Sequence, residues 1–333
     1  MCAAEAFADA DIVLADGERS VRQGLRQILI DQGYRGLRDY GSIEVVEEEV
    51  ERTLPDLVVM DALMDGGEAT SLASRIRAGE LGVNPFIGII ITVWQPSEAV
   101  IRRIVNCGTD DIIVKPLSPK QIMDRVNVVA FNRKPFVVTS EYIGPDRRSG
   151  RKLKEGEEAD PSDDVPRIEV PNTLGAKASV EPVDFVELKE MLAIAMYQIN
   201  DQCLKWHSYQ IAAIVDQIVP AYQKNRVTPT IQKEVVRLSE ISKEISDRLS
   251  DSDFEHVTDL CETLDAVTSS IRRDPKNPDP RDVDLLKAIS DAIVVSFNPE
   301  KASAEFAAEV TQMVREKYNK RLEEERAAGG AGD

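Results

Sequence analysis

With 333 residues, the chain is long enough for two domains and a connecting segment. Its net charge of -18 and pI of about 4.7 argue against non-specific DNA binding, because most of the surface would repel phosphate. Apolar residues make up 42% of the sequence, which is enough for real hydrophobic cores. However, no apolar run approaches the roughly 18 residues that span a bilayer.

The cysteines and the N-terminus predict a cytoplasmic protein. The cysteines are widely scattered and form no CxxC pair, which favours reduced thiols over a disulfide framework or a zinc site. They are Cys2, Cys107, Cys203 and Cys261. The opening stretch, "MCAAEAFADAD", lacks the basic start and the long apolar region of a signal peptide. We expect no membrane association.

Residues 9–133 alternate short apolar runs with amphipathic stretches. The runs are "DIVLAD" (11–16), "DLVVMD" (56–61), "FIGIIITV" (86–93) and "DDIIVKP" (110–116). Stretches such as "RSVRQGLRQILIDQG" (19–33) have helical spacing, with Gly33 where a helix C-cap belongs. Strands that alternate with helices pair in parallel, so the pattern predicts an α/β doubly wound parallel sheet as the first domain.

A polar side chain ends each of the four predicted strands. Asp16, Asp61, Thr92 and Lys115 hold these positions. Because ligands of an open parallel sheet bind outside the carboxyl ends of its strands, we expect the four side chains to converge. Two carboxylates in one place need a cation or a lysine to offset their charge, and oxygen ligands suit Mg²⁺. An isolated Asp at the end of a strand is more often a turn residue or an N-cap. However, four polar residues at the ends of four strands favour a phosphoryl-acceptor site.

The set of residues resembles the receiver domain of two-component response regulators, a CheY-like, flavodoxin-like fold. The matching positions are Asp16 in the acidic pair, Arg22 in the first helix, Asp61 as phospho-acceptor, Met64 three residues on, Thr92, and Lys115 with Pro116. The resemblance implies that Asp61, Thr92 and Lys115 carry the phosphoryl chemistry. It also implies a magnesium site with Asp16, Asp61 and Leu63 as candidate ligands. The implied partner is a sensor histidine kinase or a phosphotransfer protein.

Three positions depart from the family pattern. The second acid of the pair is replaced by Gly17, although Glu18 follows, and the usual Pro after the Met is Asp65. The aromatic switch position is Ile112, so the coupling between the Thr and an aromatic ring must differ or be absent. A degenerate receiver that acts as a phosphorylation-independent adaptor is therefore the alternative. Neither reading makes the protein an enzyme beyond its own phosphorylation and dephosphorylation.

Residues 134–183 are rich in Pro, Gly and charge, which predicts a mostly flexible linker. The piece "PFVVTSEYIGPDRR" has apolar and aromatic residues that a linker does not need, and we expect it to dock on a neighbouring domain. A basic cluster follows at Arg147, Arg148, Arg151, Lys152 and Lys154. It is either a solvated turn, which we favour, or a grip for phosphate or carboxylates. Its "RRxxR" string resembles the start of PilZ domains, but the strands of their barrel do not follow.

Residues 184–328 are helical in pattern and predict an all-α helical bundle. A long stretch contains Pro220, and Thr228-Pro229 starts the next helix. That helix places one apolar stripe at Val235, Leu238, Ile241, Ile245 and Leu249. We also predict a capping box from Ser252 to Glu255, a helix over 299–326 and a disordered tail.

The helical region carries no output chemistry that we recognise. By count, residues 185–333 hold 19 Lys and Arg against 27 Asp and Glu, and no basic recognition helix is present, so we expect no DNA binding. Histidine phosphotransfer at His207 or His256 is the weakest hypothesis, since the lysine that usually follows is missing from "HSYQIAAI". We expect Trp206, Tyr197, Tyr209 and Tyr222 to pack in the core or against a partner helix. The bundle would signal by binding a protein partner or by homodimerisation.

Overall fold

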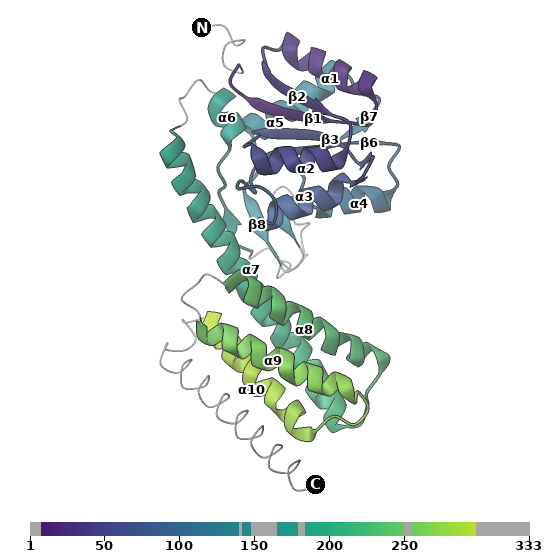
Figure 1. Ribbon diagram of the computed structural model, residues 1–333, viewed down its shortest axis with the longest axis vertical. Helices are drawn as coiled ribbons and strands as arrows, with labels where there is room; N and C mark the ends of the chain where they lie inside the picture. Colours follow the sequence, from purple (N-terminus) through teal and green to yellow (C-terminus); the bar gives the residue numbers. More distant parts are fainter. Residues whose placement is uncertain (1–7, 140–141, 148–164, 179–183, 250–254, 298–333) are drawn as a thin grey trace, which may run out of the picture. The chain divides into compact units, whose positions relative to one another are not determined.

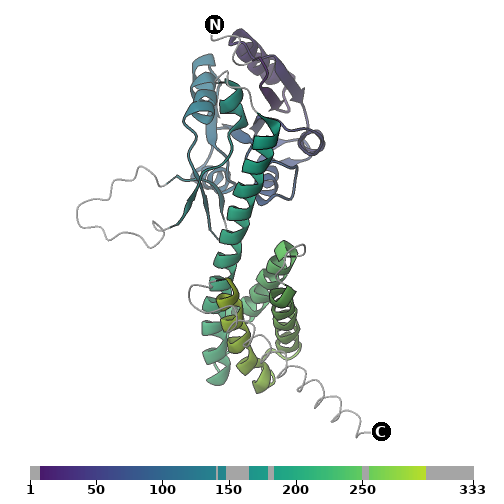
Figure 2. The same ribbon diagram turned by 90° about the vertical axis from the view of Figure 1, so that its left-hand side faces the viewer.

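The computed structural model describes residues 8–139, 142–147, 165–178, 184–249 and 255–297. The chain divides into two compact units, residues 1–199 and residues 200–333, called unit 1 and unit 2 below. Figure 1 shows the ribbon, and Figure 2 shows it turned by 90°. Among the described residues, no helix is long and apolar enough to cross a membrane.

Unit 1 contains a five-stranded sheet with the order β2-β1-β3-β6-β7, and every neighbouring pair of strands is parallel. The strands are β1 (Asp11–Ala15), β2 (Gly36–Tyr40), β3 (Leu57–Asp61), β6 (Gly88–Trp94) and β7 (Asp111–Lys115). All five residues of β3 are buried, as expected for a central strand covered on both faces. This confirms the doubly wound parallel sheet that the sequence predicts.

Helices cover both faces of this sheet (Figure 1). They are α1 (Arg19–Asp31), α2 (Ile43–Arg52), α3 (Ala69–Ala78), α4 (Glu98–Asn106) and α5 (Pro119–Phe131). One core cluster joins α1 and α5 to the sheet, and the other joins α2, α3 and α4 to the opposite face. Alternate residues of β1, β3 and β6 enter the two clusters, so these three strands are apolar almost throughout.

Two features of unit 1 were not predicted. Strand β2 is an edge strand with partly exposed residues, so it lacks the continuous apolar run of its neighbours. The short antiparallel pair β4 (Leu63–Met64) and β5 (Gly67–Glu68) follows β3 directly. Both are too short or too polar for a hydrophobic pattern to reveal them.

The segment after α5 adds a second, three-stranded sheet to unit 1. It consists of β8 (Phe136–Val138), β9 (Ile143–Pro145) and β10 (Arg167–Ile168), in the order β10-β8-β9. The short helix α6 (Thr173–Ala178) contributes Leu174, which is fully buried in the core that contains α1 and α5. Asn172 donates hydrogen bonds to two carbonyl groups of α5, and Lys177 pairs with the buried Asp56 at 2.8 Å.

Within the predicted linker 134–183, the described residues 134–139, 142–147 and 165–178 thus form strands and a helix and differ from the flexible segment that we expected. The docking predicted for the "PFVVTSEYIGPDRR" piece agrees with the packing of β8, whereas β10 and α6 were not predicted at all. The basic cluster from Arg148 to Lys154 lies outside the described residues. Arg147 is exposed and donates a hydrogen bond to the carbonyl of Thr109 at 2.5 Å.

A buried charge network joins β8 to the sheet. Asp110 accepts from Arg77 at 2.9 Å and from Arg133 at 2.8 Å, and all three side chains are at least 94% buried. The ring of Phe136 packs against both guanidinium groups, with centroid distances of 5.1 and 5.0 Å. Burial lowers the pKa of Arg77 to about 10 although Asp110 opposes the shift, so this arginine stays charged at neutral pH.

Unit 2 is helical, as predicted. Its described helices are α8 (Pro229–Leu249), α9 (Glu255–Arg273), α10 (Pro280–Phe297) and the part of α7 (Phe185–Gln223) after residue 199. The predicted stripe on α8 is buried in a core shared with the other helices. Pro220 lies inside α7, near its end. The predicted cap at Ser252 and the helix after residue 298 lie outside the described residues.

The aromatic and histidine predictions have mixed outcomes. Tyr222 is buried in the unit 2 core, but Tyr197 is 71% exposed and Tyr209 is 40% exposed, so these two do not pack in a core. His207 is buried, with its Nε2 atom 3.7 Å from Glu244. A phosphotransfer histidine has to be accessible, so this burial argues against phosphotransfer at His207. The side chain of His256 is not described.

We predict that Phe136→Ala lowers the free energy of unfolding of unit 1 by about 3–5 kcal/mol, because it empties a fully buried site and removes the ring between two arginines. The matched control is Phe131→Ala, since Phe131 is 49% exposed and its loss should cost less than about 1 kcal/mol. Urea unfolding followed by Trp94 fluorescence in a Trp206→Phe background measures both. Equal losses would contradict the packing of β8 on unit 1.

Candidate functional site

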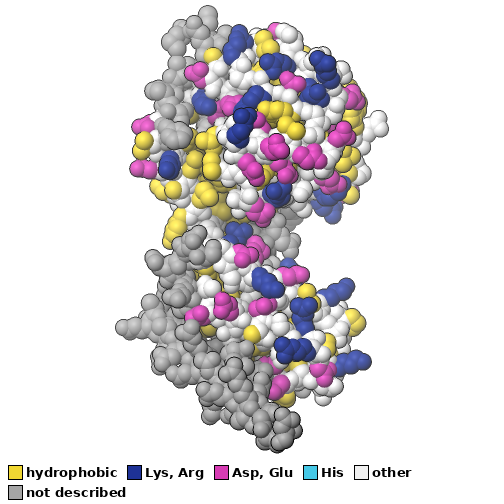
Figure 3. All heavy atoms as spheres, viewed as in Figure 1, with side chains coloured by type: hydrophobic (Ala, Val, Ile, Leu, Met, Phe, Trp, Pro, Cys, Tyr) yellow, Lys and Arg dark blue, Asp and Glu magenta, His cyan; other side chains and the backbone are white. Residues whose placement is uncertain are grey.

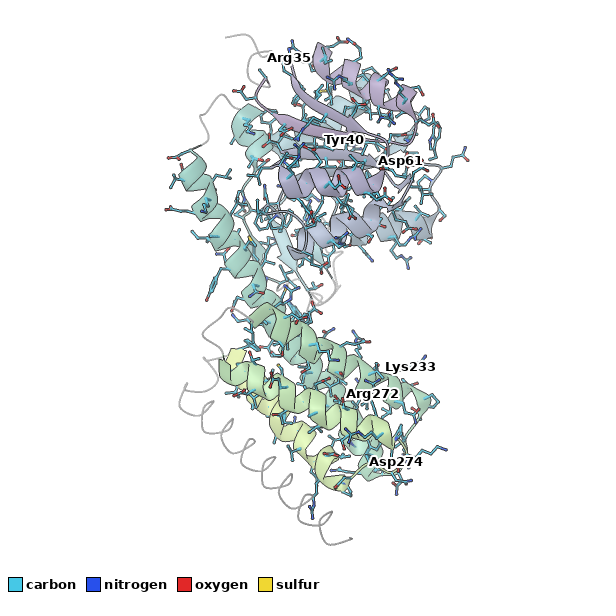
Figure 4. The ribbon with its side chains drawn as sticks, viewed as in Figure 1. Arg35, Tyr40, Asp61, Lys233, Arg272 and Asp274 are labelled. Atoms are coloured by element: carbon cyan, nitrogen blue, oxygen red, sulfur yellow. The ribbon has the colours of Figure 1, made fainter. Side chains whose placement is uncertain are left out.

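Lys115 lies between two carboxylates at the carboxyl edge of the sheet. Its Nζ atom donates to Asp16 at 2.6 Å and also contacts Asp61. Asp16 follows β1, Asp61 ends β3 and Lys115 ends β7, so the parallel topology alone brings the three together. Figure 4 labels Asp61 at this end of β3. The structure therefore joins three of the four residues predicted from the sequence.

Thr92, the fourth predicted residue, lies directly beside Asp61. The two residues are register partners on β6 and β3, and Thr92 is 1% exposed. Its hydroxyl donates to the carbonyl of Met60 at 3.5 Å, which is a long hydrogen bond. The hydroxyl is thus weakly held, on the strand next to the one that Asp61 ends.

The two carboxylates use their oxygens differently. In each Asp, Oδ1 accepts from a main-chain amide two residues on, from Glu18 to Asp16 at 2.8 Å and from Leu63 to Asp61 at 2.9 Å. In each, Oδ2 faces Lys115. The amide hydrogen bonds fix the orientation of both carboxylates, and this pre-organises the site.

The carboxylates also set the protonation of the lysine. Burial by itself lowers the pKa of Lys115, but the hydrogen bonds and charges of Asp16 and Asp61 outweigh it and raise that pKa above its ordinary value. The ammonium group therefore stays charged at neutral pH. It offsets one of the two negative charges at the site.

A cleft of about 430 Å³ opens over Asp61 and Lys115. Trp94 lines it, 53% exposed, with its ring centroid 5.8 Å from the Lys115 ammonium. The ion pair between Arg103 and Glu68, at 3.1 Å, lines another side. Trp94 was not predicted as a site residue, although its place two residues after Thr92, at the end of β6, was a usable signal.

The family departures have structural counterparts. Gly17 lines the cleft, and no atom lies within 4 Å of the point where its Cβ would be, so a side chain would fit there. Ile112 is partly buried against the cluster that includes α3 and α4. Arg22, the first-helix arginine, donates to the carbonyl of Asp16 at 2.6 Å and so supports the loop after β1.

The residues that line this cleft include ligand types that suit a magnesium ion. Mg²⁺ in proteins is usually held by one or two carboxylates plus waters and a phosphate group, and Asp16 and Asp61 supply two carboxylates. Among the residues that the structure describes, no group of three His, Cys, Asp or Glu side chains could hold a metal. With Gly17 in place of the second acid, the third protein ligand has to come from elsewhere.

A comparison with known protein families identifies the domain that carries this site. Residues 12–127 match the response regulator receiver domain. This part of the chain is a receiver domain of the two-component response regulator family, and the helical region after it is matched to no family. Receiver domains of this family interact with histidine kinases or phosphotransfer proteins, and they generally bind Mg²⁺ at their acidic site.

Individual relatives match over this domain. The phosphate regulon transcriptional regulatory protein PhoB of Pseudomonas aeruginosa is 30% identical over 118 residues, covering 35% of this chain and 50% of PhoB. The transcriptional regulatory protein ResD of Bacillus subtilis is 29% identical over 121 residues, covering 36% and 48%. The chain thus spans about half the length of the curated relatives that it matches.

Two solved structures are similar to about a third of the chain. The chemotaxis protein CheY4 of Vibrio cholerae is 18% identical with a TM-score of 0.33, covering 36% of this chain and 98% of CheY4. A CheY-like receiver domain protein of Methanospirillum hungatei is 20% identical with a TM-score of 0.32, covering 35% and 90%.

We predict that Gly17→Asp strengthens magnesium binding by roughly tenfold, since a third carboxylate in the open space beside Asp16 adds a charged oxygen ligand. Titration with Mg²⁺, followed by Trp94 fluorescence in a Trp206→Phe background, measures the affinity. Gly17→Asn is the matched control, because it has the same shape without the charge. An unchanged affinity in Gly17→Asp would place the ion away from Asp16.

We predict that Lys115→Met destabilises unit 1 by up to about 3 kcal/mol at neutral pH, because Asp16 and Asp61 then face each other without a cation. The folded-state pKa of Lys115 is raised above the unfolded value of 10.5, so its contribution is complete below pH 10.5 and lost as pH rises through the folded pKa. The difference between wild type and variant in urea unfolding should be constant from about pH 7 to 9 and shrink at more alkaline pH. A difference that already falls between pH 7 and 9 would refute the raised pKa.

Proposed function

We propose that this chain is a response regulator that accepts a phosphoryl group on Asp61. The observation that carries the proposal is the position of the Asp61 carboxylate: it faces the cleft, 11% exposed, with Lys115 in contact and Thr92 beside it. A carboxylate with a charged lysine in contact and a weakly hydrogen-bonded hydroxyl on the next strand suits phosphoryl transfer, where positioning and charge stabilisation do most of the work.

The donor in this proposal is a phosphohistidine of a sensor kinase or phosphotransfer protein. An oxygen of Asp61 attacks phosphorus, the P–O bond forms as the P–N bond breaks, and the electron pair of that bond stays on nitrogen. The imidazole leaves as a neutral ring because its other nitrogen already carries a proton. The Lys115 ammonium offsets the charge on the transferring oxygens, and the Thr92 hydroxyl donates to one of them. Asp16, Asp61 and the main-chain carbonyl of Leu63 would hold Mg²⁺, which offsets further charge when bound.

The consequence of phosphorylation would be a shift in the contacts of Lys115. A phosphoryl group on Asp61 would compete with Asp16 for the Lys115 ammonium and accept a hydrogen bond from Thr92. These new contacts would shift the receiver domain between two conformations. The output would pass to the helical unit by protein binding or dimerisation. PhoB and ResD are transcriptional regulators by name, but the chain matches only about half of each, so their output does not carry over.

Two further properties belong to this proposal. We place the protein in the cytoplasm, supported by the three described cysteines, Cys107, Cys203 and Cys261, which are free and buried. We expect no DNA binding by the helical unit, in keeping with its net negative charge.

The second candidate function is a phosphorylation-independent adaptor. Gly17 in the acidic pair and Ile112 at the switch position favour it, because both remove groups on which the family's phosphorylation and switching depend. In this case the Asp16–Lys115–Asp61 cluster is only structural, and the helical unit acts constitutively.

We predict that incubation with Mg²⁺ and acetyl phosphate adds one phosphoryl group, detected by intact mass spectrometry, and that Asp61→Asn abolishes it. The matched control is Asp65→Asn, an exposed acid four residues along, which should keep the adduct. No adduct, together with no binding of beryllofluoride, would favour the adaptor function.

A further inference from the structure

The first half of α7 carries an unusual concentration of exposed apolar side chains. Residues 191–197 read "MLAIAMY", seven apolar residues in succession, so no face of this helical segment is polar. The exposed apolar side chains in the first half of α7 are Val186 (65%), Met191 (47%), Ile194 (59%), Met196 (40%) and Tyr197 (71%). A helix that is apolar all round is normally covered on all sides.

The two sides of this segment have different surroundings. Ala195 and Ile199 are buried, so one side of the helix is already covered. Val186, Ile194 and Tyr197 are spaced by eight and three residues, which places them along the opposite side. We call these three residues the α7 stripe. Figure 3 shows hydrophobic side chains gathered on the side of unit 1 along which α7 begins.

An apolar groove of about 520 Å³ runs beside the α7 stripe, within unit 1. One wall is α7 itself, with Leu188, Leu192 and Met196. The other wall is the sheet domain, with Leu54 and Val83, which are 37% and 65% exposed. The surface therefore offers both projecting side chains and a groove that would take such side chains.

The exposed area is large enough for a dimer. Side chains of this size carry roughly 100–200 Å² each, so the exposed fractions on α7 and the groove wall add up to roughly 500–700 Å². That is at or above the largest patch of a typical monomer. Buried once on each of two copies, it gives more than about 1,000 Å² in total, which a specific interface needs.

We infer that this surface is a homodimer interface, in which the α7 stripe of one copy enters the groove of a second copy. A two-fold interface uses the same patch twice, so a patch with both a ridge and an adjoining groove is complementary to itself. The receiver family match does not include α7, since it ends at residue 127.

The interface lies at the end of the sheet away from the phosphorylation site. Asp56, which lines the groove, precedes β3, whereas Asp61 ends it. Five strand residues separate the two ends by roughly 16 Å. The inference therefore does not rest on the proposed function, and we expect the dimer with and without a phosphoryl group.

The test is sedimentation equilibrium of the full chain, up to about 100 µM, a range that detects micromolar dimers. The test variant is Ile194→Glu with Tyr197→Glu, which places charges on the α7 stripe in a residue type that keeps helical propensity. The control is Val128→Glu with Phe131→Glu, a pair with the same spacing and 40% and 49% exposure, on α5. Circular dichroism checks that both variants fold.

We expect a wild-type dimer, an unchanged control, and a dissociation constant raised roughly a hundredfold or more in the test variant. The same results are expected in the Asp61→Asn background. A monomeric wild type would overturn the inference, and so would a dimer that survives in the folded test variant or is lost in the control. A dimer that needs beryllofluoride would overturn it as well, because it would assign dimerisation to the phosphorylation site.

Discussion

The Lys115 ammonium is the interaction on which the functional edge of this sheet depends. It contacts carboxylates that follow β1 and end β3, two strands that are adjacent in the sheet and 45 residues apart in the chain. Without a buried cation between them, two neighbouring carboxylates would repel each other or one would take up a proton. The lysine thus offsets part of the negative charge at the carboxyl edge of the sheet.

Asp110, the residue before β7, neutralises neighbouring charges of one sign as Lys115 does, but here the central charge is negative. There one carboxylate neutralises two buried arginines, Arg77 and Arg133, and Phe136 packs against both. Because these arginines are fully engaged, they serve to attach β8 and the segment after α5 to the receiver domain. The compact unit that contains the receiver domain therefore extends beyond the matched residues 12–127, and α6 contributes to one of its cores.

The departures from the family pattern leave the centre of the site intact. Asp61, Thr92 and Lys115 converge as the family pattern requires, whereas the missing groups lie at its periphery, at Gly17 and Ile112. Gly17 leaves open space where the family pattern has a carboxylate, and it does not disturb the contacts of Asp61 with Lys115. Trp94 brings an aromatic ring to the cleft from β6, close to the lysine.

The sequence by itself determined four of the five strands of the sheet and which side chains meet at its carboxyl edge. Four strands were identifiable because strands buried on both faces need continuous apolar runs, and parallel pairing places their carboxyl ends together. The buried stripe on α8 followed from helical periodicity in the same way. What only the tertiary structure decided depends on contacts between distant residues, which no local pattern encodes. Strand β10 and helix α6 are short, and long-range contacts order them: β10 pairs with β8, and α6 buries Leu174 in the core while Lys177 pairs with Asp56. The sequence likewise could not show that Tyr197 is exposed, because an apolar residue on a helix fits the same local pattern whether it is buried or exposed.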